Sequence, residues 1–185
     1  MNINLLTRCL TMLLIVFTMC TSCNAFPKDE LKNIFESQKE NGYGEMVKDS
    51  IASIMLDTKS VTCELQSKNP ADTLRQDTVT KVPSKMHTVI QYLFFNEKNF
   101  QSNDTVFGYF DSWACYKFEA KKKQIVYLEM DFSLRKWRLL DKNKKIICES
   151  DMKENSMQFL HFTRLLFPKD KTLELLNHNL SAKRT

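Results

Sequence analysis

The stretch that decides the fold is residues 113–149, "WACYKFEAKKKQIVYLEMDFSLRKWRLLDKNKKIICE". Four runs within it alternate apolar and polar residues or are rich in β-branched and aromatic side chains, as strands are. We expect strands over 113–120, 124–132, 136–140 and 145–149. The short links between these runs favour antiparallel neighbours, because parallel pairing needs a long crossover. The stretch therefore predicts an antiparallel β-meander.

The flanking sequence adds further strands and helices. Three more runs of strand character cover 60–67, 76–82 and 105–110. Apolar residues at helical spacing predict helices over 28–41, 45–56, 84–95, 151–167 and 171–180. Asp151 and Glu154 resemble a capping box at the start of the fourth helix. The chain is thus expected to fold as α+β, with an antiparallel β-meander of about five to seven strands packed against N-terminal, central and C-terminal helices.

The order of these elements is similar to that of the NTF2-like family. Over residues 28–149 the expected order is α-α-β-β-α-β-β-β-β-β. In that family a curved antiparallel sheet wraps a layer of helices, and the resemblance implies a pocket between the two. It rests on element order alone, and a plain sandwich of one sheet and its helices is the alternative.

The N-terminal segment is typical of a signal peptide. Residues 10–19, "LTMLLIVFTM", are apolar and uncharged, and Arg8 precedes them. A run of this length is shorter than the roughly twenty residues that span a bilayer as a helix, and it matches the apolar region of a leader. We therefore expect residues 1–22 to be a signal peptide and residues 28–185 to be a single domain.

The residues that follow, "CTSC" at 20–23, resemble a bacterial lipobox. In lipoproteins two small residues precede a cysteine that receives lipid, although Cys20 stands where an aliphatic residue is usual. The resemblance implies acylation of Cys23, for example by palmitate, and a lipidated stalk over 23–27. It also implies attachment to the cell envelope, in the outer membrane or at the cell surface. The alternative is ordinary cleavage after Ala25 and release as a secreted soluble protein.

Composition argues against several classes of function. The chain has three glycines, and none belongs to a phosphate-binding loop or a nucleophile elbow. The formal net charge of +5 is mild and does not indicate a nucleic-acid partner. The sequence predicts no cofactor, no metal site and no catalytic residue.

Cysteines and histidines give no catalytic pattern either. Three cysteines lie in expected strands and are interpreted as small buried side chains, with one disulfide possible in an exported protein: Cys63, Cys115 and Cys148. Three histidines lack the spacing of metal ligands, and we expect helix-edge or solvent positions for them: His87, His161 and His178.

A basic and aromatic cluster is the best candidate for a binding surface. Its members are Lys121, Lys122, Lys123, Arg135, Trp137 and Arg138, with Lys142, Lys144 and Lys145 nearby. Such a surface suits anionic glycans, lipid headgroups or an envelope protein. The simpler interpretation is that these lysines keep strand edges solvated and unpaired.

Two functional hypotheses follow. The first is a lipid-anchored, non-enzymatic binding or accessory domain of the envelope, and the leader favours it. The second is an enzyme or small-ligand binder whose pocket is lined by Tyr109, Trp113 and Tyr127, with Asp111, Glu129 and Asp131 as acids and bases. A turn for Asp111 and a solvated strand face for Glu129 and Asp131 are the simpler interpretations.

Overall fold

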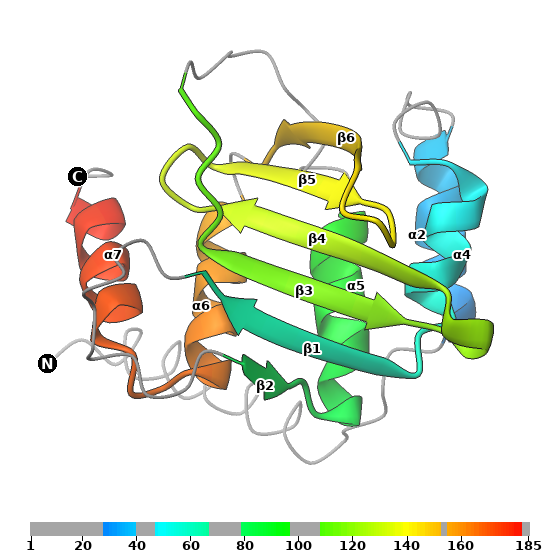
Figure 1. Cartoon of the computed structure of the whole chain (residues 1–185), viewed down its shortest axis with the longest axis horizontal. Coiled ribbons are helices and arrows are strands. Elements are labelled where there is room, and N and C mark those ends of the chain that lie inside the picture. Colours follow the sequence, from blue (N-terminus) through cyan, green and yellow to red (C-terminus); the bar gives the residue numbers. More distant parts are fainter. Residues whose placement is uncertain (1–27, 40–46, 67–78, 97–107, 153–154, 183–185) are drawn as a thin grey trace, which may run out of the picture.

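The centre of the molecule is a six-stranded antiparallel sheet (Figure 1). It comes from a computed structural model, which describes residues 28–39, 47–66, 79–96, 108–152 and 155–182. The strands are β1 Ser60–Leu65, β2 Val79–Lys81, β3 Ala114–Glu119, β4 Ile125–Asp131, β5 Lys136–Leu140 and β6 Ile146–Asp151. Their order across the sheet is β2-β1-β3-β4-β5-β6. The consecutive neighbours β3 to β6 confirm the predicted meander.

The strand register assigns each side chain to one face of the sheet, because successive residues point to opposite faces. One row of partners faces the helices and is apolar apart from a tyrosine hydroxyl and two thiols: Cys63, Tyr116, Leu128, Leu139 and Cys148. The adjacent row faces the other way and is mostly charged: Glu64, Cys115, Glu129, Arg138 and Glu149. A shift of one residue would exchange the two rows, so the apolar pattern fixes the pairing.

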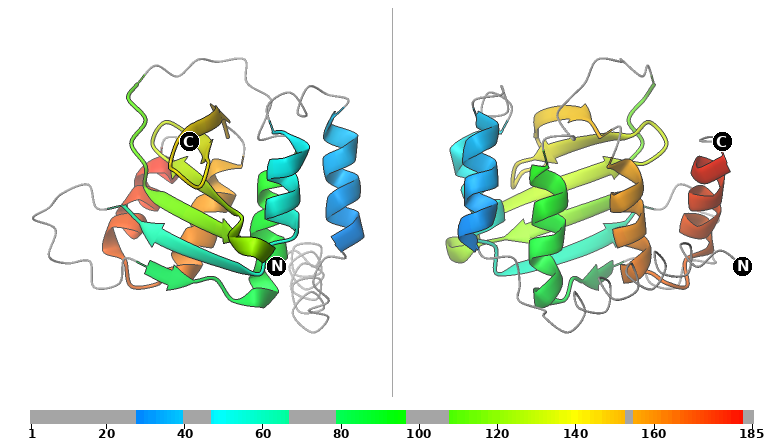
Figure 2. Two further views of the ribbon diagram at one scale, coloured as in Figure 1. Left: turned by 45° about the vertical axis from the view of Figure 1, so that its right-hand side comes forward. Right: turned by 180° about the vertical axis from the view of Figure 1, so that it is seen from behind.

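Helices of the described residues cover one face of the sheet. They are α2 Lys28–Lys39, α4 Asp49–Leu56, α5 His87–Phe95, α6 Ser156–Leu166 and α7 Lys171–Ala182, and the 3-10 turn η1 Ser84–Met86 precedes α5. Figure 2 shows α5 and α6 crossing the back of the sheet, with α2 and α4 at one side and α7 at the other. No helix of the described residues lies on the opposite surface, which we call the helix-free face.

Large aromatic side chains fill the space between the sheet and the helices. Trp137 is fully buried and meets Phe94 of α5 edge-on, with 5.1 Å between ring centroids. Tyr116 is also fully buried, and its hydroxyl lies 2.6 Å from Oγ1 of Thr163 in α6. Burial of each such side chain stabilises the fold by about 1.5–3 kcal/mol before entropy is counted. These side chains occupy the layer where the NTF2-like resemblance implies a pocket.

Two expected strands differ from the structure. Of the run 105–110, residues 105–107 lie outside the described residues, and residues 108–110 are not a strand. Phe110 instead lies against the guanidinium of Arg138, 3.9 Å from its ring centroid, and so rests on the sheet without pairing in it. Of the run 76–82, the structure shows β2 over Val79–Lys81, and residues 76–78 lie outside the described residues.

The helix boundaries differ in two places. The predicted start at Asp151 is wrong, because Asp151 is the last residue of β6 and pairs with Lys136 of β5. The chain stays extended as far as Met152, whose N–H donates to the carbonyl of Arg135 at 2.7 Å, and α6 begins at Ser156. Glu154, the other half of the expected capping box, lies outside the described residues. The predicted helix 45–56 is shorter, with α4 beginning at Asp49.

Candidate functional site

The predicted binding residues do not form a single surface. Lys121–Lys123 make the exposed 3-10 turn η3 between β3 and β4. Arg135 lies in the turn between β4 and β5, at the opposite end of the sheet, because β4 runs the full distance between the two turns. Arg138 lies within β5 on the helix-free face. The sequence cluster is therefore divided among two ends and one face.

The assignment of Trp137 to a binding surface is wrong. Its side chain is 0% exposed and belongs to the core between sheet and helices. Its neighbours Lys136 and Arg138 point to the helix-free face, because side chains alternate along a strand. A tryptophan between two basic residues in a strand therefore indicates a core position.

Arg138 has two partners on the helix-free face. Its Nε donates to Oε2 of Glu129 at 2.8 Å, and its guanidinium carbon lies 3.9 Å from the ring centroid of Phe110. The Arg138 side chain is 23% exposed and that of Glu129 is 13% exposed, so the pair is largely shielded from water. Cation–π contacts of this kind stabilise by about 0.5–2 kcal/mol. This arrangement fastens Phe110 to the sheet.

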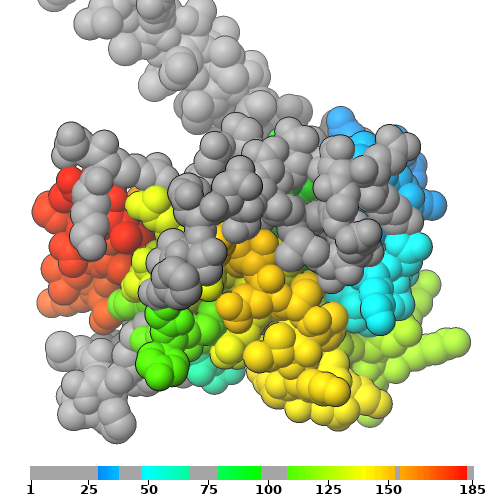
Figure 3. Space-filling view, turned by 90° about the horizontal axis from the view of Figure 1, so that it is seen from above, coloured from blue at the N-terminus to red at the C-terminus, as the bar shows by residue number. Residues whose placement is uncertain are grey.

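Lysines gather at one end of the sheet, which we call the lysine end. It consists of segments 57–59, 119–123 and 141–145, which hold seven lysines and three carboxylates, a net charge of +4. The segments meet because the backbone N–H of Lys59 donates to the carbonyl of Glu119 at 2.8 Å, and Leu140 pairs with Tyr127 beside the same turn. Figure 3 shows the η3 turn, in lime green, projecting at the right of the molecule. All seven lysines are exposed.

Three lysines of this end have an unusual backbone. Lys122, Lys123 and Lys144 have φ values of 59°, 56° and 65°, in the left-handed region that glycine and asparagine adopt most readily. The Nζ of Lys144 lies 3.5 Å from the ring centroid of Tyr127 and 3.6 Å from Sγ of Cys115, so this lysine folds back over the helix-free face. The other lysines of the end extend charge into the solvent.

A buried carboxylate organises the other end, which we call the Asp131 end. Asp131 is 0% exposed, and its oxygens accept hydrogen bonds from three backbone N–H groups. The donors are Asp111 at 2.8 Å, Ser133 at 2.9 Å and Leu134 at 3.0 Å. The expectation of a solvated strand face therefore fails for Asp131. Its carboxylate holds the β4–β5 turn and the chain at Asp111 together.

The aromatic residues of the alternative pocket lie apart. Tyr109 is 99% exposed. The Nε1 of Trp113 donates to Oγ of Ser133 at 3.0 Å, which attaches this ring to the Asp131 end. Tyr127 lies near the lysine end beneath Lys144. Neither of the two hollows described below is lined by any of these three rings.

The three described thiols are free and protonated at neutral pH. Burial raises the pKa of Cys115 and of Cys148 to about 11, and it raises the pKa of Cys63 still further. A thiolate is the nucleophilic form, so these side chains are unreactive. The interpretation of Cys63 and Cys115 as small buried residues is confirmed, whereas Cys148 is half-buried.

Histidines have structural partners. His87 is more buried than a helix-edge position suggests, since it is 7% exposed and its Nε2 lies 3.1 Å from the carbonyl oxygen of Val82. Burial lowers the pKa of His87 below its ordinary value. His161 is exposed as expected, and its Nε2 lies 3.0 Å from Oδ1 of Asn177.

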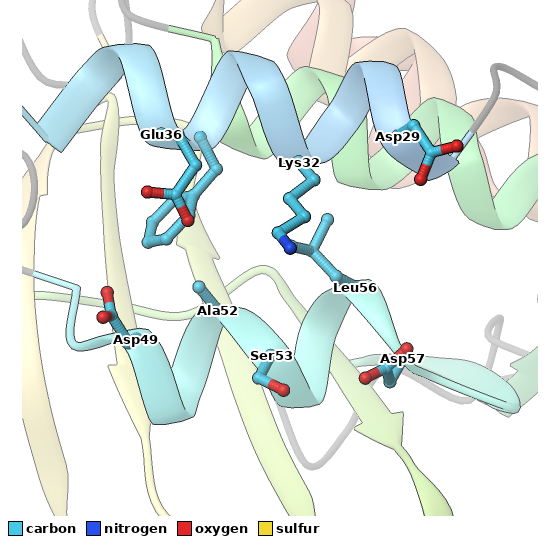
Figure 4. Close-up of a pocket in the computed structure, with 9 residues that line it drawn as sticks. Asp29, Lys32, Glu36, Asp49, Ala52, Ser53, Leu56 and Asp57 are labelled. Carbon is cyan, nitrogen blue, oxygen red and sulfur yellow. The ribbon is translucent and has the colours of Figure 1, made fainter.

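A groove between α2 and α4 was not predicted from the sequence (Figure 4). Its volume is about 360 Å³, and its apolar lining includes Phe35, Ala52 and Leu56. The polar lining is one lysine, one serine and four carboxylates: Lys32, Ser53, Asp29, Glu36, Asp49 and Asp57. Lys32 lies between the two acidic ends of the groove (Figure 4). An electronegative rim over an apolar floor suits a basic group on an apolar stem.

The sequence does contain a signal for this groove. Asp29, Lys32 and Glu36 have the spacing i, i+3, i+7, and Asp49, Ser53 and Asp57 have the spacing i, i+4, i+8. Each set therefore follows one helix face. The sequence alone does not say that the two faces meet, because that depends on how α2 packs against α4.

A second hollow lies between α6 and α7. Its volume is about 530 Å³, and its lining includes His161, Arg164, Phe167 and Glu174. Asp170 also lines it, but the Oδ1 of that residue accepts the N–H of Leu173 at 2.8 Å at the start of α7. This carboxylate therefore caps a helix.

Within the described ranges, no three His, Cys, Asp or Glu side chains come together in a group that could hold a metal ion. No helix among them is both long enough and apolar enough to cross a membrane.

No protein-family model matches the chain, and no curated protein or solved structure matches it either.

Proposed function

We propose that this chain is an exported protein that is attached to an envelope membrane by lipid on Cys23. Its domain, residues 28–185, acts there as a non-enzymatic binding or accessory domain. The observation that carries the proposal is the leader, in which an apolar run at residues 10–19 is followed by "CTSC" at 20–23. The proposed attachment is physically sufficient, since each buried methylene adds about 0.8 kcal/mol of membrane affinity and two or three chains hold a protein stably.

The state of the potential catalytic groups supports binding over chemistry. Asp131 is engaged by three backbone N–H groups, and Glu129 is paired with Arg138 at 2.8 Å. A general acid or base needs a titratable group within reach of a substrate, and both carboxylates already have structural partners. The raised pKa values of Cys115 and Cys148 disfavour nucleophilic catalysis in the same way.

Metabolic labelling with a radioactive fatty acid tests the attachment. The full chain is expressed in a bacterium with a lipoprotein-processing pathway, as wild type, as Cys23→Ala and as Cys20→Ala. We expect label in the wild type and in Cys20→Ala, and loss of essentially all label in Cys23→Ala. Cys20→Ala is the matched control, because it removes the other cysteine of the same short segment.

The proposal is wrong if Cys23→Ala retains the label of the wild type. Release of an unlabelled protein that begins at Phe26 would instead establish cleavage after Ala25 and a secreted protein.

A further inference from the structure

We propose that the lysine end of the sheet lies against the anionic phospholipid headgroups of the membrane that holds the chain. The proposal rests on the proposed attachment through Cys23. It adds which part of the domain faces the bilayer and names the chemical class of the surface that this part contacts.

The length of chain between the lipid and the domain limits how the domain can sit. Helix α2 begins at Lys28, five residues after Cys23. Five residues span at most about 18 Å even when fully extended. The first turn of α2 therefore stays within about 18 Å of the acylated cysteine, and whatever surrounds that turn is close to the headgroups.

The first turn of α2 belongs to the same side of the molecule as the lysine end. Asp29 of α2 and Asp57 after α4 line the same end of the groove between these helices (Figure 4). Two residues after Asp57, the N–H of Lys59 donates to the carbonyl of Glu119 at 2.8 Å. Lys121 follows Glu119 by two residues. The start of α2 and the η3 turn therefore lie on the same side of the molecule.

The charge of this end complements an anionic bilayer. Its seven exposed lysines outnumber its three carboxylates, and each lysine near an anionic lipid surface strengthens binding roughly fivefold. Lys122, Lys123 and Lys144 also occupy left-handed backbone positions where glycine or asparagine would fit with less strain. Lys122 and Lys123 thus carry exposed charge at positions where backbone sterics alone favour glycine or asparagine.

The far side of the molecule offers internal controls. Lys169 and Lys171 are exposed near the start of α7, and α7 lies across the sheet from α2 and α4 (Figure 1). The opposite turn, 132–135, holds a single basic residue, Arg135. An orientation that places the lysine end on the membrane leaves Lys169 and Lys171 in water.

Lysine footprinting on vesicles tests the orientation. The purified full chain is inserted into vesicles of phosphatidylcholine alone, or of phosphatidylcholine and phosphatidylglycerol in equal parts. Brief acetylation followed by mass spectrometry gives a rate for each lysine. We expect the lysines of the η3 turn, together with Lys142 and Lys145, to react roughly fivefold more slowly on the anionic vesicles. Lys169 and Lys171 should react equally on both.

Several results would overturn the proposal. Equal rates on the two vesicle types, or protection of Lys169 and Lys171 instead, would exclude contact through the lysine end. Protection by soluble heparin with none by anionic vesicles would assign the surface to an anionic glycan. The intact mass of the same sample separates the two proposals. An acylated protein without protection refutes the orientation alone, whereas a protein without acyl chains refutes the attachment.

Discussion

The two ends of the sheet use the same device, an aspartate at a turn, in different ways. Asp131 is fully buried and accepts three N–H groups, one of them from Asp111, twenty residues earlier in the chain. Asp141 at the lysine end accepts two, from Asn143 at 2.8 Å and Lys145 at 2.9 Å, both within its own turn. The first carboxylate ties distant segments together, and the second shapes only a local loop.

The two ends also differ in whether their charged side chains are buried or exposed. At the Asp131 end the acid is enclosed, and Trp113 and the nearby chain rest on the turn. At the lysine end the basic side chains are exposed, whereas positive φ occurs at both ends, at three lysines here and at Arg135 of the Asp131 end. Burial with long-range hydrogen bonds stabilises a fold, whereas exposed charge on strained turns does not. The Asp131 end therefore maintains the structure, and the lysine end is the part that we propose to contact the membrane.

Exchanging each aspartate for asparagine should give the largest measurable difference in stability between the two ends. Asp131→Asn removes the charge that three backbone N–H groups share, and the amide nitrogen of asparagine cannot accept from any of them. We expect the free energy of unfolding to fall by about 3 kcal/mol. Asp141→Asn, the matched control, should lower it by less than about 1 kcal/mol, because its partners are close to water. Urea unfolding followed by circular dichroism measures both.

Equal losses for the two variants would show that the ends do not differ in this way. A larger loss for Asp141→Asn would reverse the assignment.

Replacing a strained lysine with glycine should have a smaller effect of opposite sign. Lys122→Gly relieves the steric cost of a left-handed residue, although glycine is also freer in the unfolded chain. We expect a net gain of about 0.5–1 kcal/mol in the free energy of unfolding. Lys121→Gly, in the same turn but without positive φ, should destabilise by a similar amount. Thermal unfolding of both variants gives the sign of each change in stability. Lower stability of Lys122→Gly would show that the left-handed backbone of Lys122 is not strained.

The meander could be predicted from the sequence because its signals are local. Alternation along 113–149 identifies four strands, and the short links between them leave antiparallel pairing as the simple solution. The start of α6 could not be placed in this way, because Asp151 suits a helix cap as well as it suits the end of β6. Pairing of Asp151 with Lys136 decides between the two, and pairing is a property of the whole sheet.

The candidate site was harder to predict than the fold. The turn lysines were found from composition, but Trp137 was assigned to the same surface although alternation places it between two outward-facing residues. The role of Asp131 depends on Asp111, which approaches it only after folding. The groove between α2 and α4 depends on how two helices pack. The pattern of a single sequence shows which residues share one face of a helix or strand. A site also depends on which of these faces pack together in the folded chain.

Depth-dependent fluorescence quenching of the acylated chain on anionic vesicles tests the central claim most directly. A fluorophore is placed at Lys142→Cys in the lysine end or at Tyr109→Cys beside the Asp131 end, with the half-buried Cys148 replaced by alanine. Cys9 and Cys20 belong to the expected leader and are absent from the acylated chain. The core thiols Cys63 and Cys115 should escape labelling, because burial raises their pKa values. Lipids with a nitroxide on the headgroup should quench the probe at position 142 strongly and the probe at position 109 weakly. Equal quenching, or stronger quenching at position 109, would contradict the claim that the lysine end faces the membrane.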